Sequence, residues 1–279
     1  MRHPFILFIA IGMCLPGFAD PVSFGAMGDG PREGDDWPRL AQQVFEEGQD
    51  KDTSLLLHLG DITRGTDVLP EWYYAGVATV LKSCKNPVYI VPGDNEWNDL
   101  DTPADGWALW TQYFQKFETH WSGRAVQTQH QDEHPANLVF QEGHVLFIGL
   151  NLVGGAVHDR AEWKARHALC VQWVEKQLNS ADDSVSAVVV FAQAALGPKH
   201  WDFSRTFFPL VEKFEKPVMF LHGDHHNFQW EPGFQVPNLL RVQVDQVTNA
   251  PPLKITVAES GDMPFSYDRR LLAVVPPTE

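Results

Sequence analysis

Residues 89–97 read "YIVPGDNEW", an apolar run that stops at Pro92-Gly93 and is followed at once by Asp94, Asn95 and Glu96. The apolar residues are typical of a short buried strand, and Pro-Gly is a turn signal. The stretch therefore predicts a strand whose carboxyl end presents two acids and an amide. One such strand end is commonly a turn or a helix N-cap. The same ending on several strands would indicate a shared site.

Four more apolar runs end in polar groups: Asp29 in "MGDG", Asp61 in "LGDITRG", Gln193 in "FAQAA", and Asp224, His225 and His226 in "HGDHH". The intervals between successive positions are 32 (61 − 29), 33 (94 − 61), 99 (193 − 94) and 31 (224 − 193) residues. Intervals near 32 suit one strand–helix–strand unit. Because ligands of open α/β sheets collect beyond the carboxyl ends of the strands, we expect these side chains to meet.

The rest of the chain alternates short apolar runs with segments of helical spacing. Strands are expected near 22–27, 54–60, 87–93, 186–193 and 217–223, with helices near 37–48, 70–83, 105–118, 161–179 and 204–214. A hairpin is expected to turn through Glu142-Gly143, and the C-terminal part alternates like an antiparallel sheet. The pattern predicts an α/β domain with a largely parallel centre, in a single domain over residues 20–279.

The first nineteen residues differ from the rest. Arg2 and His3 precede the apolar stretch "FILFIAIGMCL", and small residues follow in "PGFAD". This order predicts a signal peptide, residues 1–19, cleaved after Ala19, and hence a secreted or periplasmic protein. A buried first strand is the alternative. The stretch is too short to span a bilayer comfortably, and no other segment is long and apolar enough to do so.

Composition limits the partners that the chain can take. With 279 residues, 44% of them hydrophobic, it can bury a large core. The formal net charge of −15 disfavours binding to the phosphate backbone of nucleic acids and to anionic membranes. No protein partner can be inferred. Cys84 and Cys170 remain after the predicted signal peptide, and the sequence leaves open whether they pair or are separately buried thiols.

Clustered carboxylates repel one another unless a cation lies between them, so the strand ends predict a metal site that holds two ions. Their order resembles that of the calcineurin-like metallophosphoesterases, which include purple acid phosphatases and cyclic-nucleotide phosphodiesterases. The resemblance covers roughly residues 22–260 and implies a four-layer α/β/β/α sandwich of two mixed sheets flanked by helices. It implies that the site residues divide between two metals: Asp29 and His226 on the first, Asp61 bridging, and Asp94, Gln193 and Asp224 on the second.

The sequence departs from the family pattern at five positions. Pro31, Gln193 and Asp224 stand where the family has histidines, and Asp94 stands where it has an asparagine. Asn95 replaces the histidine that steadies the phosphoryl group and protonates the leaving group in that family. Four carboxylates favour hard cations, so Mn²⁺ or Mg²⁺ is expected, with Ca²⁺ also suitable and Zn²⁺ or iron less so. The added negative charge predicts activity that rises towards alkaline pH.

These residues predict a metal-dependent hydrolase of phosphoric esters, either a phosphomonoesterase or a phosphodiesterase, that acts on a small phosphorylated substrate. Asp61 would orient the nucleophile, Asn95 would position the phosphoryl group, and His225 is a candidate proton donor with a structural role as the equal alternative. The other function class is a catalytically silent protein of the same fold that binds cations or a phosphorylated ligand. Loss of the usual histidine favours this second class, and the complete set of ligands favours the first.

Overall fold

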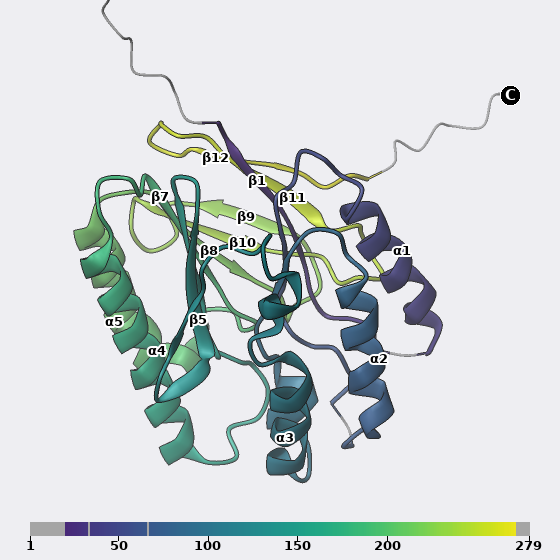
Figure 1. Ribbon diagram of the computed structural model, residues 1–279. Coiled ribbons are helices and arrows are strands. Elements are labelled where there is room, and N and C mark those ends of the chain that lie inside the picture. Colours follow the sequence, from purple (N-terminus) through teal and green to yellow (C-terminus); the bar gives the residue numbers. More distant parts are fainter. Residues whose placement is uncertain (1–19, 33, 66, 272–279) are drawn as a thin grey trace, which may run out of the picture.

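The computed structural model describes residues 20–32, 34–65 and 67–271, so the predicted signal peptide lies outside the described residues. Two sheets pack face to face, with helices on both outer faces (Figure 1). The first sheet has the order β12-β11-β1-β2-β3 and the second has the order β4-β5-β6-β7-β8-β10-β9. This arrangement confirms the predicted four-layer α/β/β/α sandwich.

The first sheet consists of β1 (Val22–Met27), β2 (Leu56–His58), β3 (Val88–Ile90), β11 (Leu253–Val257) and β12 (Phe265–Asp268). The second consists of β4 (Gln129–Gln131), β5 (His134–Glu142), β6 (Val145–Gly149), β7 (Ala187–Phe191), β8 (Val218–His222), β9 (Gln229–Pro232) and β10 (Leu239–Gln243). The longer helices are α1 (Trp37–Glu47), α2 (Glu71–Lys82), α3 (Pro103–Phe114), α4 (Arg160–Ser180) and α5 (Trp201–Phe214). The predicted elements are therefore present; β1 has the expected bounds, and β2, β3, β7 and β8 are shorter than expected.

Both sheets are parallel at their centres. Strands β1, β2 and β3 run parallel, as do β6, β7, β8 and β10. The antiparallel pairings involve β11 and β12 in the first sheet and β4, β5 and β9 in the second. Parallel strands bring their carboxyl ends to the same edge of a sheet. Each sheet therefore offers one edge at which the loops after successive strands lie together.

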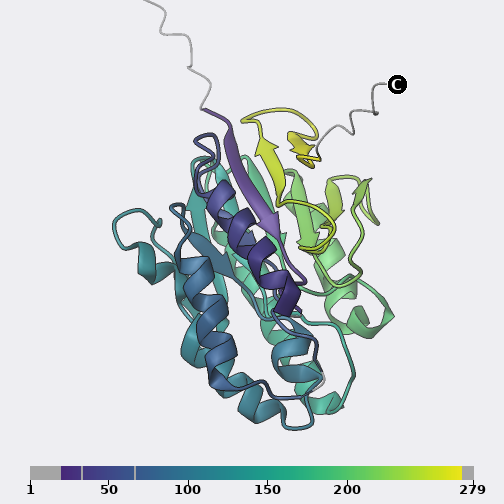
Figure 2. The ribbon, with the colours of Figure 1, turned by 90° about the vertical axis from the view of Figure 1, so that its right-hand side faces the viewer.

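Three apolar clusters hold the layers. The cluster between the sheets joins the inward faces of β1 and β3 to those of β5 and β6: Phe24 packs edge-on against Phe147 at 5.1 Å, and Phe140 stacks on Tyr89 at 3.8 Å. A second cluster lies under α4 and α5 and a third under α1, α2 and α3. Figure 2 shows α1 and α2 in front of the first sheet. Full burial of one such aromatic side chain stabilises the fold by about 1.5–3 kcal/mol.

The two described cysteines do not form a disulfide. Cys84 is buried with the helices of the first sheet and Cys170 with those of the second, and both are free thiols. Burial raises the pKa of Cys170 to about 12 and that of Cys84 to about 11. The question that the sequence left open is thus decided in favour of two separate, unreactive thiols.

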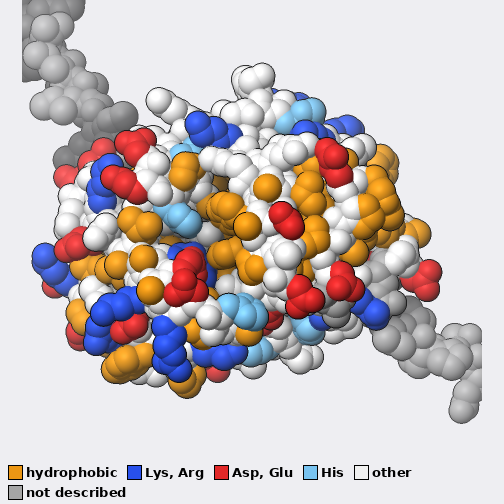
Figure 3. All heavy atoms as spheres, turned by 90° about the horizontal axis from the view of Figure 1, so that it is seen from below, with side chains coloured by type: hydrophobic (Ala, Val, Ile, Leu, Met, Phe, Trp, Pro, Cys, Tyr) orange, Lys and Arg blue, Asp and Glu red, His pale blue; other side chains and the backbone are white. Residues whose placement is uncertain are grey.

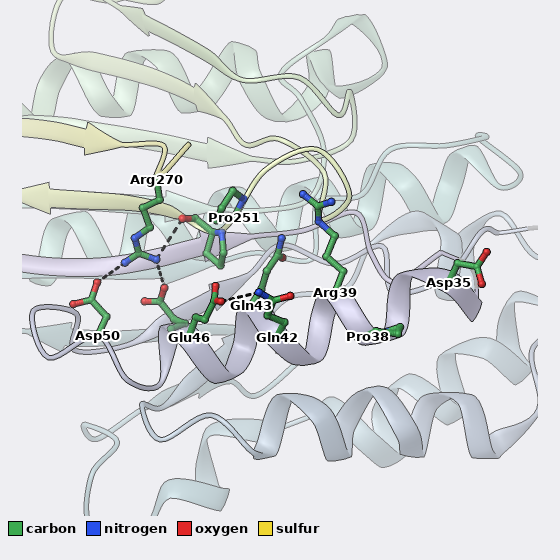
Figure 4. Close-up of a pocket in the computed structure, with 11 residues that line it drawn as sticks. Asp35, Pro38, Arg39, Gln42, Gln43, Glu46, Asp50, Pro251 and Arg270 are labelled. Atoms are coloured by element: carbon green, nitrogen blue, oxygen red, sulfur yellow. Dashed lines mark hydrogen bonds and ion pairs between the residues drawn. The ribbon is translucent and has the colours of Figure 1, made fainter. Parts of the chain in front are cut away.

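A surface cavity of about 830 Å³ runs along α1 (Figure 4). Arg270 closes one end of it: its guanidinium contacts Glu47 and donates to Asp50 Oδ2 at 2.7 Å. Glu47 is buried, so this pair anchors the C-terminal end of the described chain to α1. None of the site residues predicted from the sequence lines this cavity. Across the described ranges, no helix is long and apolar enough to cross a membrane.

Buried His58 gives the fold a measurable pH response. Burial lowers its pKa from 6.5 to about 4, although a hydrogen bond to the Gly30 carbonyl acts in the opposite direction. The unfolded chain therefore takes up this proton first as the pH falls, and the corresponding stability is present above about pH 6.5 and lost towards pH 4. We expect the wild-type chain to lose about 3 kcal/mol relative to His58→Gln over that window. Urea unfolding of both proteins across the window measures this, and parallel pH profiles would contradict it.

Candidate functional site

The polar strand ends converge at the edge where both sheets end. Asp29, Asp61 and Asp94 follow β1, β2 and β3 of the first sheet, while Gln193 and Asp224 follow β7 and β8 of the second. Figure 3 views the molecule from below, the side towards which β1 points, and shows acidic and histidine side chains among hydrophobic ones. The expected meeting of distant acids at the strand ends is found.

The backbone is unusual at four of these residues. Asp29, Asp61, Asp224 and His226 have φ angles of 57°, 58°, 75° and 65°. Non-glycine residues rarely adopt positive φ, and each such residue costs of order 1–3 kcal/mol unless its surroundings impose it. Four residues with positive φ in one site indicate that the surrounding fold holds the backbone in an unfavourable conformation, which fixes the directions of these side chains.

The glycines before Asp61 and Asp94 allow the loops after β2 and β3 to touch. Gly60 has φ of 81°, and a Cβ on it would overlap the backbone of Gly93. A Cβ on Gly93 would overlap the backbone nitrogen and Oδ1 of Asp61. The Gly-Asp pairs of the sequence are therefore required by the close approach of two loops, and they place the Asp61 carboxyl directly against the next strand end.

Asp61 lies at the centre of the hydrogen bonds. Its Oδ1 accepts the backbone N–H of Asn95 at 3.2 Å, and its Oδ2 accepts the Asn95 side-chain amide at 3.2 Å. The same Oδ2 accepts Nε2 of Gln193 at 3.2 Å. Thr63 in turn donates to the Asn95 carbonyl at 2.9 Å. Asn95 is thus fixed against Asp61 by its backbone and its side chain.

The second sheet reaches the site through Asp224 and His226. The backbone N–H of Asp224 donates to Asp29 Oδ1 at 3.1 Å, and His226 Nε2 lies 3.8 Å from the same oxygen. Arg32 Nη1 lies 3.0 Å from His226 Nε2, and because a guanidinium can only donate, that ring nitrogen is the acceptor. Asp29 Oδ2 is buried without a hydrogen-bond partner. A buried, unsatisfied carboxylate oxygen is what a bound cation would satisfy.

The acids raise one another's pKa. Burial, followed by the charges of Asp224 and Asp94, raises the pKa of Asp29 to about 7. Burial and the neighbouring Asp61 raise the pKa of Asp94 to about 10, and burial with Asp29 raises that of Asp61 well above its ordinary range. Positive charge placed among these groups would restore their ionised forms.

The donor chemistry fits a hard divalent cation, because carboxylate oxygens dominate and Asp29 Oδ2 lacks a partner. As the side chains stand, however, no group of three His, Cys, Asp or Glu residues in the described ranges is arranged to hold a metal ion. Asp61 and Asp94 instead accept hydrogen bonds from amide groups. Cation binding thus requires these carboxylates to turn from their present partners. The ligand assignments to Asp29, Asp61, Asp94, Gln193, Asp224 and His226 stay predictions.

Gln193 and His225 differ in how far they are buried. Gln193 is fully buried, and its Oε1 accepts the backbone N–H of Gly154 at 2.6 Å while Nε2 faces the acids. His225 has a side chain 63% exposed, with Nε2 3.8 Å from Asp224 Oδ2. His225 is therefore beside the site and free of tight packing.

Two contributors lie outside the predicted set of site residues. Glu96, in the first turn of the π-helical segment Asp94–Asn98, accepts the N–H of Gly93 at 2.5 Å and that of Ile62 at 3.3 Å through its carboxyl group. The loop after β6 was missed altogether. It supplies the N–H of Gly154, and its Ala156 N–H donates to Asp99 Oδ1 at 2.7 Å. Only the glycine pair 154–155 marks this loop in the sequence.

Two cavities are lined by residues next in sequence or space to the site. One of about 270 Å³ is lined by Arg32, Arg64, Gly65 and Trp72 among others, and Gly65 packs directly against the Asn95 side chain. The other, of about 450 Å³, includes Trp97 of the π-helical turn Asp94–Asn98. None of the site residues predicted from the sequence lines either cavity.

No protein-family model and no curated protein matches the sequence. Solved structures do share the fold. A dimetal phosphatase from Danio rerio is 12% identical with a TM-score of 0.58, over 89% of this chain and 99% of that one. The GAP50 anchor of the Plasmodium inner membrane complex is 11% identical with a TM-score of 0.55, over 89% and 88%. A 5'-nucleotidase from Candida albicans is 10% identical with a TM-score of 0.55, over 88% of this chain and 51% of that one.

Proposed function

From a chain that has the fold of the calcineurin-like metallophosphoesterases, we propose a metal-dependent hydrolase of phosphoric esters. One observation carries the proposal: three buried carboxylates with raised pKa values, Asp29, Asp61 and Asp94, converge after strands of the first sheet. The partly buried Asp224 meets them from the second sheet, and Asp29 Oδ2 has no hydrogen-bond partner. Similarity to a phosphatase and a nucleotidase supports the reaction class. The first nineteen residues support export, and the net charge supports a small substrate over a nucleic acid.

The residues that would hold a cation are Asp29, Asp61, Asp224 and His226, with Asp94 beside Asp61. Their oxygen-rich chemistry favours Mn²⁺ or Mg²⁺. Divalent cations supply positive charge that draws electrons from phosphoryl oxygens and lowers the pKa of water. The resemblance extends this to a second cation that Asp61 shares.

The chain's own groups would orient the reaction. Asn95 is fixed by Asp61 and Thr63, and the second N–H of its side-chain amide can donate to a phosphoryl oxygen and so stabilise the negative charge that develops there. It has no proton to give to a leaving group. His225 is exposed next to Asp224 and can carry that proton. Substrates with acidic leaving groups need it least.

A specific observation favours the silent binder as the second candidate. The Asn95 side chain donates to Asp61 and contains no titratable proton, so general acid catalysis is missing where the family has it. A protein of this kind would bind cations or a phosphorylated ligand without turnover. The same experiment separates the two functions.

Removal of the metal tests both candidate functions. After EDTA treatment and dialysis, we expect no hydrolysis of p-nitrophenyl phosphate or its bis-ester, and recovery with Mn²⁺ or Mg²⁺ that increases towards alkaline pH. Saturating Mn²⁺ at about 100 times Kd should add about 2.7 kcal/mol to the free energy of unfolding. Thermal unfolding with and without Mn²⁺ measures this.

Asp29→Asn is the matched control, because asparagine tolerates the positive φ of this position. It should lose most of the thermal shift and keep the fold. Stabilisation of the wild type without turnover would select the silent binder, and the absence of both would contradict both functions.

A further inference from the structure

Gln193 has a fully buried side-chain amide that contacts two of the acids. Its Oε1 accepts the Gly154 N–H at 2.6 Å, and its Nε2 donates to Asp94 Oδ1 at 2.7 Å and to Asp61 Oδ2 at 3.2 Å. The side chain is 0% exposed. Three hydrogen bonds therefore hold this amide from both ends.

The orientation of the amide follows from its partners. The backbone N–H of Gly154 can only donate, so the amide oxygen must face Gly154 and the amide nitrogen must face the acids. A flipped amide would place its NH₂ against the Gly154 N–H and its oxygen against two carboxylates. It would lose the hydrogen bond from Gly154 and both hydrogen bonds that Nε2 donates to the acids.

The amide nitrogen thus occupies the space between Asp61 and Asp94. The resemblance assigns Asp94, Gln193 and Asp224 to a second cation, which Asp61 shares with the first. A Mg²⁺ ion bound there needs carboxylate oxygens at about 2.0–2.1 Å, and Ca²⁺ needs them at about 2.3–2.6 Å. Neither distance is compatible with an N–H donor between the same two oxygens. A second ion must therefore displace the amide from all three partners.

We propose that Gln193 closes the second metal position, so that the chain binds a single divalent cation at the side of Asp29, Asp224 and His226. The inference rests on the proposed cation-dependent function and deepens it. The NH₂ group of Gln193 stands in for the second ion by neutralising part of the Asp61–Asp94 repulsion, but it brings no net charge. The site is then mononuclear where the solved relative is described as dimetal.

The isosteric change Gln193→Glu provides the test. One glutamate oxygen still accepts the Gly154 N–H, while the other replaces the NH₂ and turns a donor into a cation ligand. We expect wild-type protein, stripped with EDTA, to bind one Mn²⁺ per chain, and Gln193→Glu to bind two. Equilibrium dialysis gives the stoichiometry. Electron paramagnetic resonance should change from the spectrum of an isolated Mn²⁺ ion to that of an exchange-coupled pair.

Two further variants keep the result interpretable. Gln193→His offers an uncharged nitrogen ligand at the same place and should also bind two ions, in case added negative charge prevents folding. Gln177→Glu in α4 makes the same substitution away from the site and should leave the stoichiometry at one. Circular dichroism verifies the fold of each.

Two ions in the wild type would overturn the role of Gln193 while leaving metal-dependent hydrolysis intact. One ion in both folded Gln193 variants would overturn it as well. Absence of binding in the wild type and in every variant would instead contradict the proposed function itself.

Discussion

Asp61→Asn is expected to lower kcat/KM for phosphate esters by at least about 10³-fold, because the change removes the negative charge of a proposed cation ligand and one of the two acceptor oxygens that position Asn95. Both nitrogens of Asn95 donate to this carboxyl group. Asparagine is among the residues that tolerate φ of 58°, so the fold should survive. Initial rates with p-nitrophenyl phosphate at saturating Mn²⁺ measure the loss.

The matched control is Asp183→Asn, an equal change of charge at an exposed position. It should retain wild-type rates. Activity of Asp61→Asn within about tenfold of wild type, with an unchanged circular dichroism spectrum, would remove Asp61 from the reaction and with it the centre of the site.

Asn95→His should increase activity, an unusual expectation for a site residue. Proton donation to a leaving group typically contributes about 10²–10⁴-fold, so an imidazole here should raise kcat by about 10²-fold for alkyl phosphates. Much less gain is expected for p-nitrophenyl phosphate, whose leaving group needs no proton. Gly65 packs directly against the Asn95 side chain, so the imidazole must turn towards the exposed side of this partly buried position.

Comparing the two substrate types separates chemistry from repacking. A new proton donor should also add a descending limb to the pH–rate profile on the alkaline side, as the imidazolium loses its proton. Equal changes for both substrates, with no new limb, would show that position 95 acts only by positioning.

Much of the fold could be predicted because apolar runs and Gly-Asp endings are local patterns. Asp29, Asp61 and Asp94 each follow a strand of one parallel group, so the intervals near 32 residues were enough to predict that these side chains lie close together. The sequence could not reveal the loop after β6, because its contributions are backbone N–H groups, which any residue other than proline has.

The orientation of the Gln193 side chain could not be predicted from the sequence. Its place at the end of β7 was predictable, whereas the direction of its amide depends on Gly154, 39 residues earlier in the chain. Whether the side chain offers an oxygen or a nitrogen to Asp61 is a property of that distant contact. Likewise, the sequence does not show that Cys84 and Cys170 are far apart, because this depends on the different apolar clusters in which the two thiols are buried.

The division of the acids between two sheets has a mechanical consequence. Asp29, Asp61 and Asp94 follow strands of the first sheet, and Asp224 and His226 follow a strand of the second, so an ion bound by both sets would cross-link the two sheets at their carboxyl-terminal edge. Without the ion, repulsion between the acids would favour local separation of the two sheets, beginning at that edge. Removal of the ion should then increase the rates of amide hydrogen exchange in the loops after β1 and β8 to a similar extent, while exchange rates at the opposite end of the sandwich stay unchanged.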